Sequence, residues 1–272
     1  MLLWELGCAG WVSIDVPWHN RLAWDRQVAQ GNPWTVPVSS EVIARARRGD
    51  WTVVLTPNKP VPRSWLGELS GRRLLALASA GGQQAPVFAA AGAIVSVLDN
   101  SPAQLSQDRA VAEREGLALD LQLGEMTDLT RFPDQSFDII FHPCSNVFVP
   151  DIRPVWRECF RVLRPGGTLM AGFTQPVAFL FDPDRFQSDG ALIVRRSLPY
   201  SDIAALPPEE LKRRLEAGET LEFGHTLDDQ IGGQLDAGFV MRAFFEDRWD
   251  HPIDRYINTY AATWVFRPEK EP

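Results

Sequence analysis

Two short stretches of the chain combine a tight turn with a carboxylate in a pattern that could bind a ligand. The turn, Ser79 to Gly82, lies between a predicted buried strand (Leu74 to Ala78) and an apolar helix that opens near Gln84. Asp99 ends the next predicted strand, Ile94 to Leu98. Small residues let the backbone pass close to a ligand, and the free N–H groups of a helix start point at it. Because an acid at the end of the second strand can bind both hydroxyls of a ribose, the pattern predicts half of a nucleotide-binding βαβ unit.

The turn taken alone has two other interpretations. It could pack a helix on a strand without binding anything, because small residues also allow close packing. If it does bind a nucleotide, the ligand could be a dinucleotide or another adenosine compound, and the rest of the chain has to distinguish the two.

The composition is that of an ordinary globular protein. The chain has 272 residues, 45% of them hydrophobic, which is enough for one large α/β domain with additions. A net charge of -8 argues against a nucleic-acid partner, because phosphate binding relies on clustered Lys and Arg. The sequence has no apolar run of about 18 residues that could span a bilayer, and its start lacks the pattern of a secretory leader. We therefore expect a cytoplasmic protein without a membrane or nucleic-acid partner.

The three cysteines do not form a recognisable site. Cys8, Cys144 and Cys159 are widely spaced and contain no CxxC pair. Neither a disulfide framework nor a zinc site is predicted, so we expect no metal and a reducing compartment.

The first 70 residues differ from the rest because they hold most of the tryptophans. These are Trp4, Trp11, Trp18, Trp24, Trp34, Trp51 and Trp65. Ser39 or Ser40 caps a predicted helix that stops at Gly49. We interpret the segment as a cap rather than a sheet layer. Its rings could attach it to the main domain, or one or two could line a pocket where a ring face meets a cation such as a sulfonium.

After Asp99 the chain alternates between predicted helices and strands. Ser101 starts a helix that runs to Glu115, with Gln104 closing a capping box. The following elements are a strand at Leu119 to Leu123, a strand at Ile139 to Phe141, a helix from about Ile152 to Leu163, a break at Arg164 to Gly167 and a strand at Thr168 to Phe173. Five such βα units imply a parallel sheet with right-handed crossovers. Its carboxyl edge, where ligands bind, receives the loops Gly124 to Leu129 and His142 to Asn146.

The alternation stops between Thr174 and about Thr226, a stretch that we interpret as a lid or small subdomain. Within it, Pro208 opens a predicted helix that ends at Gly218. A second helix starts at a capping box on Thr226, and its internal Gly232-Gly233 pair predicts that something packs closely against it. The last two strand-like runs are Phe239 to Phe245 and Tyr256 to Phe266, and they should pair antiparallel.

With these elements in order, the chain resembles the class I S-adenosylmethionine-dependent methyltransferases (methyltransferase type 11) over Leu74 to Arg267. Four motifs carry the resemblance: the turn Ala78 to Gly82, Asp99, FPDQSFDII at Phe132 to Ile140, and RVLRPGGTL at Arg161 to Leu169. The resemblance implies an α/β fold with a Rossmann-like, doubly wound, seven-stranded sheet, mostly parallel with an antiparallel C-terminal strand. Residues 1–70 would be the N-terminal cap, and residues 71–267 the methyltransferase domain with a lid insertion at about 174–226.

The resemblance also implies S-adenosylmethionine as the cofactor and assigns residues to it. The turn and helix start would back its methionine part through Ala78, Ser79, Ala80, Gly81, Gly82 and Gln84. Asp99 and Asn100 would hold the ribose, and Glu125 and Met126 would flank the adenine. The loop at His142 to Asn146 would face the reacting centre, and His142 would also contact the cofactor.

Three alanines depart from the family pattern. Ala76 stands where the first strand usually carries an acid, and Ala78 and Ala80 replace two of the usual glycines. We expect Gly81-Gly82 to take over the close approach to the cofactor. The side-chain amides of Gln83-Gln84, at the helix start, would then compensate for the replaced glycines.

Methyl transfer is an in-line displacement on a sulfonium carbon, so positioning and exclusion of water contribute most. A base is needed only if the nucleophile is still protonated at the working pH. We predict catalytic roles for His142 and Asn146, which follow a strand at its carboxyl end. His225 and Tyr200 are weaker candidates, because a helix-cap neighbour and a packing residue explain them equally well.

The expected function is methyl transfer to a small-molecule acceptor that the cap and the lid enclose. One alternative is a catalytically degenerate S-adenosylmethionine-binding sensor or scaffold, which the three alanines motivate. Another is an NAD(P)-dependent oxidoreductase, which is disfavoured because the sequence contains no Tyr-x-x-x-Lys pair.

Overall fold

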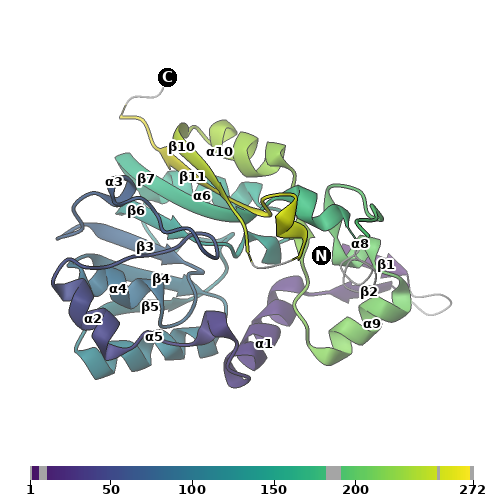
Figure 1. Cartoon of the computed structure of the whole chain (residues 1–272), viewed down its shortest axis with the longest axis horizontal. Coiled ribbons are helices and arrows are strands. Elements are labelled where there is room, and N and C mark those ends of the chain that lie inside the picture. Colours follow the sequence, from purple (N-terminus) through teal and green to yellow (C-terminus); the bar gives the residue numbers. More distant parts are fainter. Residues whose placement is uncertain (1, 6–10, 182–190, 250–251, 270–272) are drawn as a thin grey trace.

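The computed structural model describes residues 2–5, 11–181, 191–249 and 252–269. Its centre is a seven-stranded sheet with the order β10-β11-β7-β6-β3-β4-β5 (Figure 1). The strands are β3 (Arg73–Leu77), β4 (Ile94–Asp99), β5 (Leu119–Leu123), β6 (Phe137–His142), β7 (Leu163–Thr174), β10 (Val240–Asp247) and β11 (Tyr260–Phe266). β11 is antiparallel to both β7 and β10, and the other pairs are parallel. The predicted fold class and the predicted antiparallel terminal pair are confirmed.

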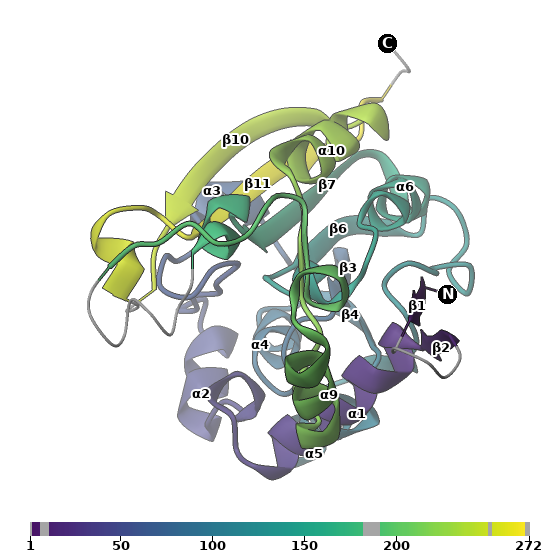
Figure 2. The same cartoon turned by 90° about the vertical axis from the view of Figure 1, so that its right-hand side faces the viewer.

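Helices cover both faces of the sheet (Figure 2). One face carries α2 (Ser40–Arg47), α3 (Arg63–Leu66), α4 (Gln84–Ala90) and α5 (Pro102–Glu115), and the other carries α6 (Arg153–Val162) and α10 (Gly233–Asp236). A π-helix (Asp228–Gly232) leads into α10, and short 3-10 helices lie at Pro33–Thr35, Asn146–Phe148, Pro176–Leu180 and Pro252–Arg255. Burial of apolar side chains on both faces is what a doubly wound sheet requires.

The predicted strands lie within a few residues of the observed ones, and β7 is the largest difference. We expected a break at Arg164 to Gly167, but β7 begins at Leu163, directly after α6. Leu163 pairs with Phe137, and Gly166 donates its N–H to the Arg267 carbonyl at 2.8 Å. These two pairings hold the glycine-containing segment in the sheet.

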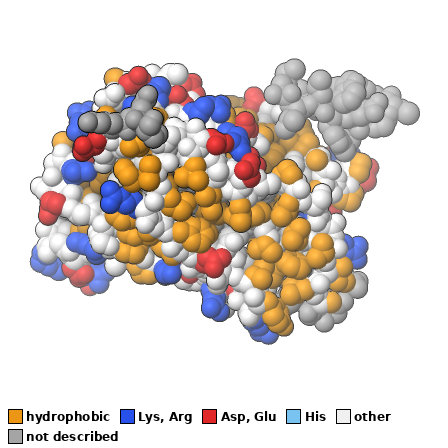
Figure 3. All heavy atoms as spheres, turned by 90° about the horizontal axis from the view of Figure 1, so that it is seen from above, with side chains coloured by type: hydrophobic (Ala, Val, Ile, Leu, Met, Phe, Trp, Pro, Cys, Tyr) orange, Lys and Arg blue, Asp and Glu red, His pale blue; other side chains and the backbone are white. Residues whose placement is uncertain are grey.

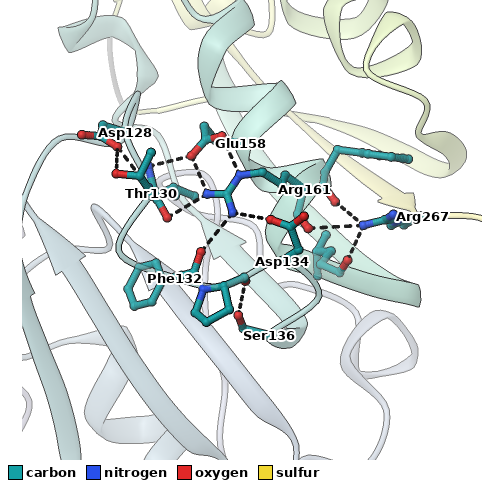
Figure 4. A network of polar contacts seen from close by, with 12 residues as sticks. Asp128, Thr130, Phe132, Asp134, Ser136, Glu158, Arg161 and Arg267 are labelled. Carbon is teal, nitrogen blue, oxygen red and sulfur yellow. Dashed lines mark hydrogen bonds and ion pairs between the residues drawn. The ribbon is translucent and has the colours of Figure 1, made fainter.

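Arg161 joins the two motifs that gave the resemblance most of its specificity. Its guanidinium donates to the Phe132 carbonyl at 3.0 Å and to the Asp134 carboxylate at 2.7 Å, both in the FPDQSFDII stretch. It also donates to the Leu129 carbonyl at 2.9 Å and to the Glu158 carboxylate at 2.7 Å (Figure 4). The two motifs therefore stabilise each other, and their role in this structure is to fix the loops around β6.

The N-terminal segment uses its tryptophans in both of the ways we considered. Trp51 and Trp65 belong to the core on the α4 face, where the Trp65 ring stacks on Trp264 with centroids 5.6 Å apart. Trp24 and Trp34 instead line a cavity. The segment also contains elements that we did not predict, namely a hairpin of β1 (Leu2–Glu5) and β2 (Trp11–Ile14) and the helix α1 (Val16–Ala29).

The segment between Thr174 and Thr226 packs against α1 (Figure 2). Its described elements are β8 (Tyr200–Ser201), α8 (Asp202–Ala205), α9 (Pro208–Ala217) and β9 (Phe223–Gly224). Val16 of α1 lies in one apolar cluster with Leu211 of α9 and Leu221. The prediction of a helix from Pro208 to a stop at Gly218 is confirmed, because Gly218 has the left-handed φ of 66° that ends α9.

The edge strand β10 carries charges beside its exposed apolar side chains. Val240 and Phe244 are exposed on it, and so are the charged side chains of Arg242 and Glu246. Hydrophobic and charged side chains intermingle on the face seen from above, where β10 and α10 lie (Figure 3). Charges on an edge strand disfavour pairing with another chain.

The predicted close contact at the glycine pair exists at Gly233. A β-carbon there would lie 2.9 Å from Cδ1 of Trp156, which is fully buried in α6. A β-carbon at Gly232 would meet only the flexible Asp228 side chain. Gly233 therefore lets α10 approach α6.

This difference gives a matched pair of variants. We expect Gly233→Ala to lower the free energy of unfolding by about 1–3 kcal/mol, because Trp156 has to move. Gly232→Ala should leave it unchanged or raise it by up to about 1 kcal/mol, because alanine is the better helix former. Urea unfolding followed by circular dichroism measures both, and equal losses in the two variants would contradict this account.

Candidate functional site

One cavity of about 590 Å³ lies at the carboxyl ends of the central strands. It is lined by the turn after β3, the end of β4, the loop after β5 and the loop after β6. Residues of α1, the Thr174–Thr226 segment and the loop between β10 and β11 complete its wall. The volume is typical of a site that encloses a small ligand.

The turn after β3 keeps the backbone of a glycine turn although it contains alanines. Ala78 has a φ of 46° and Ala80 a φ of 65°, both in the left-handed region that favours glycine. Both alanines line the cavity, and so does Ser79 between them. Ser79 Oγ is buried and has no hydrogen-bond partner within the described part of the chain. A buried hydroxyl without a partner on a cavity wall is suited to a polar ligand.

Gly81 and Gly82 contact the protein rather than the cavity. The Gly81 N–H donates to Gln104 Oε1 at 2.9 Å, and the Gly82 N–H donates to Asp108 Oδ1 at 2.8 Å. A β-carbon at Gly81 would lie 2.4 Å from the Gln104 carbonyl, and one at Gly82 would lie 2.9 Å from Pro37. Our expectation that these glycines provide the close approach to the cofactor is therefore wrong: they allow packing on α5 and on the N-terminal segment.

Gln104 also corrects the predicted capping box of α5. Ser101 Oγ accepts the Gln104 N–H at 3.1 Å, as predicted. The Gln104 side chain does not return to the N–H of Ser101, which donates to Asp99 Oδ1 at 2.8 Å instead. The reason is that the buried Gly81 N–H needs an acceptor, and the Gln104 amide supplies it.

The glutamine pair at the start of α4 connects the turn to the N-terminal segment. Gln83 Nε2 donates to the carbonyls of Pro33 at 2.8 Å and Val36 at 3.0 Å, and Gln84 Oε1 accepts the Val54 N–H at 3.3 Å. Both glutamines also line the cavity. They therefore help to place the N-terminal segment over the site.

Asp99 lies on the cavity wall at the end of β4. Burial raises its pKa most strongly, the N–H of Ser101 acts in the opposite direction and the nearby charges of Glu125 and Asp25 add to the rise, which leaves the pKa at about 7. Burial also raises the pKa of Asp108, which lies behind the turn, to about 8. Asp99 is thus a carboxylate whose charge is costly until a ligand donates hydrogen bonds to it.

The loop after β6 contributes different residues from those we predicted to be catalytic. Its cavity-lining members are Pro143, Cys144 and Ser145. His142 is fully buried, its Nδ1–H donates to the Leu77 carbonyl at 3.0 Å, and its ring lies edge-on to Trp156. Burial lowers the pKa of the imidazole to about 4, so the ring is neutral at neutral pH. The structure places His142 against α6 and off the cavity wall.

The other polar candidates also have partners inside the protein. Asn146 forms an amide pair with Gln230, and His225 Nε2 lies 3.0 Å from the Asn146 carbonyl. The Tyr200 hydroxyl donates to Asp202 at 2.5 Å. None of these three side chains is among the residues that line the described cavity, so the catalytic roles of His142 and Asn146 stay predictions without geometric support.

The structure brings most of the predicted cofactor residues together on one wall. These are Ala78, Ser79, Ala80, Gln84, Asp99, Asn100, Glu125 and Met126. Gly81, Gly82 and His142 lie behind this wall. The same cavity is also lined by residues that the sequence analysis missed, among them Asn20, Glu222, Trp249 and Tyr260. They come from segments without a recognisable motif, so only the tryptophan-rich composition pointed to part of this lining.

Comparison with known proteins identifies the family. A family model described as a methyltransferase domain matches residues 75–171. The chain is 51% identical over 245 residues to an uncharacterized methyltransferase, YbaJ, of Bacillus subtilis (strain 168), covering 90% of this chain and 96% of that one. The chain belongs to the class I S-adenosylmethionine-dependent methyltransferases.

Two further matches are more distant. A sterol 24-C-methyltransferase of Gibberella zeae is 30% identical over 174 residues, which cover 63% of this chain and 40% of that one. The crystal structure of an S-adenosylmethionine-dependent methyltransferase from Mesorhizobium loti has a TM-score of 0.57 at 21% identity, covering 75% of this chain and 95% of that chain. The solved structure agrees with the fold described above.

The cofactor of this methyltransferase is S-adenosylmethionine, which supplies a methyl group on a sulfonium. The wall built by Ser79, Asp99 and Glu125 fits it, because a free buried hydroxyl faces the place expected for the methionine part and the two carboxylates offer acceptors for ribose and adenine donors. The NAD(P)-dependent oxidoreductase that we considered is set aside by the family. Among the described residues, no group of three or more His, Cys, Asp or Glu side chains could hold a metal ion. No helix in the described ranges is long and apolar enough to cross a membrane.

The pKa of Asp99 gives a testable pH dependence. Since only the ionised carboxylate accepts from both ribose hydroxyls, affinity for S-adenosylhomocysteine should fall as the pH drops through the folded-state pKa of about 7. Between pH 8 and pH 6 the ionised fraction falls about tenfold, and the affinity should follow it. Calorimetric titration at several pH values measures this, and an affinity that is flat over this range would contradict the assignment.

Proposed function

We propose that the protein transfers the methyl group of S-adenosylmethionine to a small-molecule acceptor that shares one cavity with the cofactor. The observation that carries this proposal is the continuity of the cavity. The same space is lined by Ser79 and Asp99, which we assign to the cofactor, and by Phe148, Trp249 and Tyr260, which we assign to the acceptor side. A second ligand could therefore bind next to the cofactor.

Elements from both ends of the chain surround the acceptor side of the cavity. The rings of Trp34 and Trp249 meet edge to face with centroids 5.3 Å apart, and Trp249 in turn lies 6.3 Å from Tyr260. Trp24 meets Phe148 in the same way at 5.2 Å. Such an aromatic wall binds apolar groups and excludes water, which favours displacement on a sulfonium carbon. It would also exclude a folded protein or a nucleic acid as the acceptor.

A labelling experiment tests this proposal. The protein is incubated with S-adenosylmethionine carrying a trideuterated methyl group and with two fractions of a cell extract, one of metabolites and one of macromolecules. We expect the label in the metabolite fraction only, detected by mass spectrometry. Label in the macromolecular fraction would contradict a small-molecule acceptor. Cofactor binding without label in either fraction would favour the catalytically degenerate sensor or scaffold.

A further inference from the structure

Glu222 is a carboxylate on the acceptor side of the cavity that the cofactor assignment does not use. It follows α9 and directly precedes β9. Among the described residues, no hydrogen-bond donor contacts its carboxylate, although its backbone N–H is bonded. A carboxylate in a cavity without a hydrogen-bond donor is costly, so its presence calls for a ligand that can donate to it.

The backbone around Glu222 is held from three sides. The buried Asn20 of α1 accepts the Leu221 N–H at 2.8 Å and donates to the Leu221 carbonyl at 3.0 Å. Asp202 Oδ2 accepts the Glu222 N–H at 2.8 Å, and the Asp202 N–H donates to the Glu222 carbonyl at 3.0 Å. The next residue, Phe223, pairs with Ser201 across β8 and β9. Glu222 is therefore fixed on the cavity wall by buried contacts.

The charged neighbours of Glu222 already have partners of their own. Asp202 is bound by Tyr200 at 2.5 Å and by Arg214 at 3.2 Å. Arg196, which also lines the cavity, lies over the Tyr200 ring with its guanidinium carbon 4.9 Å from the centroid. The phenol of Tyr260 is a further titratable group near Glu222.

These neighbours leave Glu222 suited to accepting a proton near neutral pH. Burial raises its pKa most strongly and the charge of Asp202 adds to this, while Arg214 and Arg196 act in the opposite direction, which leaves the pKa at about 7. The pKa of this carboxyl group is closer to that of a buried amine than to that of an alcohol or a phenol. Burial in an apolar cavity lowers the pKa of an amine toward that of Glu222, whereas it raises the pKa of a phenol away from it.

We propose that the methyl acceptor is an amine, and that Glu222 binds its amino group and takes up the proton that this group loses on methylation. In the balanced step, the lone pair of the neutral nitrogen forms the new N–C bond to the methyl carbon. The C–S bond breaks, and its electron pair remains on sulfur, which becomes a neutral thioether. One N–H proton goes to the Glu222 carboxylate, which becomes a neutral acid. This inference rests on the proposed function and names its substrate class.

Three probes that share a phenylethyl group test it by calorimetry on protein saturated with S-adenosylhomocysteine. The probes are phenethylamine, 2-phenylethanol and 3-phenylpropanoate, at pH 8. Saturation occupies the wall that contains Asp99 and Glu125, so the amine can only report on the rest of the cavity. We expect phenethylamine to bind about ten- to a hundredfold more tightly than 2-phenylethanol, the effect of one charge-assisted hydrogen bond.

The variants are Glu222→Gln and, as the matched control, Glu219→Gln. Glu219 lies three residues earlier and is half exposed beside Arg214, outside the lining of the cavity. Glu222→Gln should remove the preference for the amine, and Glu219→Gln should keep it. The inference is overturned if the preference survives Glu222→Gln, if no probe is preferred, or if 3-phenylpropanoate binds most tightly, in which case Arg196 governs recognition.

The titration with S-adenosylhomocysteine separates this inference from the proposed function. Suppose that the wild type and Glu222→Gln bind S-adenosylhomocysteine equally well, but the wild type does not prefer phenethylamine to 2-phenylethanol. In that case only the amine inference fails. If the wild type does not bind S-adenosylhomocysteine at all, the cofactor site itself fails, and the proposed function fails with it. Equal melting temperatures of the two variants show that Glu222→Gln has not disturbed the fold.

Discussion

Replacing Asp99 with asparagine is expected to weaken the binding of S-adenosylhomocysteine by about ten- to a hundredfold, the loss of hydrogen bonds to a charged acceptor. Asparagine keeps the Oδ1 atom that accepts the Ser101 N–H at 2.8 Å, so the start of α5 stays intact. It loses the charge and one acceptor toward the ribose. The variant should also lose the pH dependence between pH 6 and pH 8, since no carboxyl group is left to titrate at this position.

Calorimetric titration at pH 8 measures this effect, with Asp50→Asn as the control. Asp50 is an exposed carboxylate that pairs only loosely with Arg45, at 3.8 Å, and is not part of the cavity wall. Its replacement should leave the affinity unchanged. Equal affinities of wild type and Asp99→Asn would show that Asp99 does not hold the cofactor.

Replacing Trp156 with alanine is expected to lower the free energy of unfolding by about 3–5 kcal/mol, the range for deleting a large buried side chain. The ring is fully buried between the sheet and α10, and its Nε1–H donates to the Asp229 carbonyl at 2.9 Å. The ring also packs edge-on against His142, with centroids 6.0 Å apart. The variant would leave a cavity and a carbonyl without its donor.

The control for this prediction is Trp18→Ala. Trp18 is 54% exposed, and its ring lies near Arg21 on the surface of α1. Its removal should change the free energy of unfolding by no more than about 0.5 kcal/mol. Urea unfolding gives both values, and a loss below about 1 kcal/mol in Trp156→Ala would contradict the packing described here.

The sheet could be predicted because its strands carry strong local signals. β3, β4 and β6 are nearly continuous apolar runs, as expected of parallel strands that are buried on both faces. The start of α5 was equally clear, since Ser101 is the N-cap and Pro102 occupies the first helical position. These local patterns agree with the tertiary structure.

The helix α1 was missed because its pattern does not look amphipathic. Its buried residues are Val16, Asn20 and Ala23. The polar Asn20 is buried because its side chain forms hydrogen bonds with the backbone of Leu221 and Phe148. Such burial depends on a segment some 200 residues away in the sequence, which local periodicity cannot reveal.

The sequence indicated the residues of the cavity wall that follow predicted strands, but not those that tertiary packing brings to the cavity. The turn and Asp99 are placed by β3 and β4, and Glu125 lies in the loop after β5, so their positions followed from the predicted strands. His142 also lies at the carboxyl end of a strand, but its side chain points to the α6 face of the sheet. Successive residues of β6 alternate between the two faces, and Phe141 points to the α4 face. Glu222 and Trp249 reach the cavity only through tertiary contacts.

The measurement that tests this account most directly is a crystal structure of the protein with S-adenosylhomocysteine. The account predicts electron density in the cavity at the ends of β3 and β4, with the ribose hydroxyls within hydrogen-bond distance of the Asp99 carboxylate. The space beside Cys144 and Glu222 should stay open for the acceptor. Density outside this cavity, or a ligand that fills the side of Glu222 and leaves Asp99 without a contact, would contradict it.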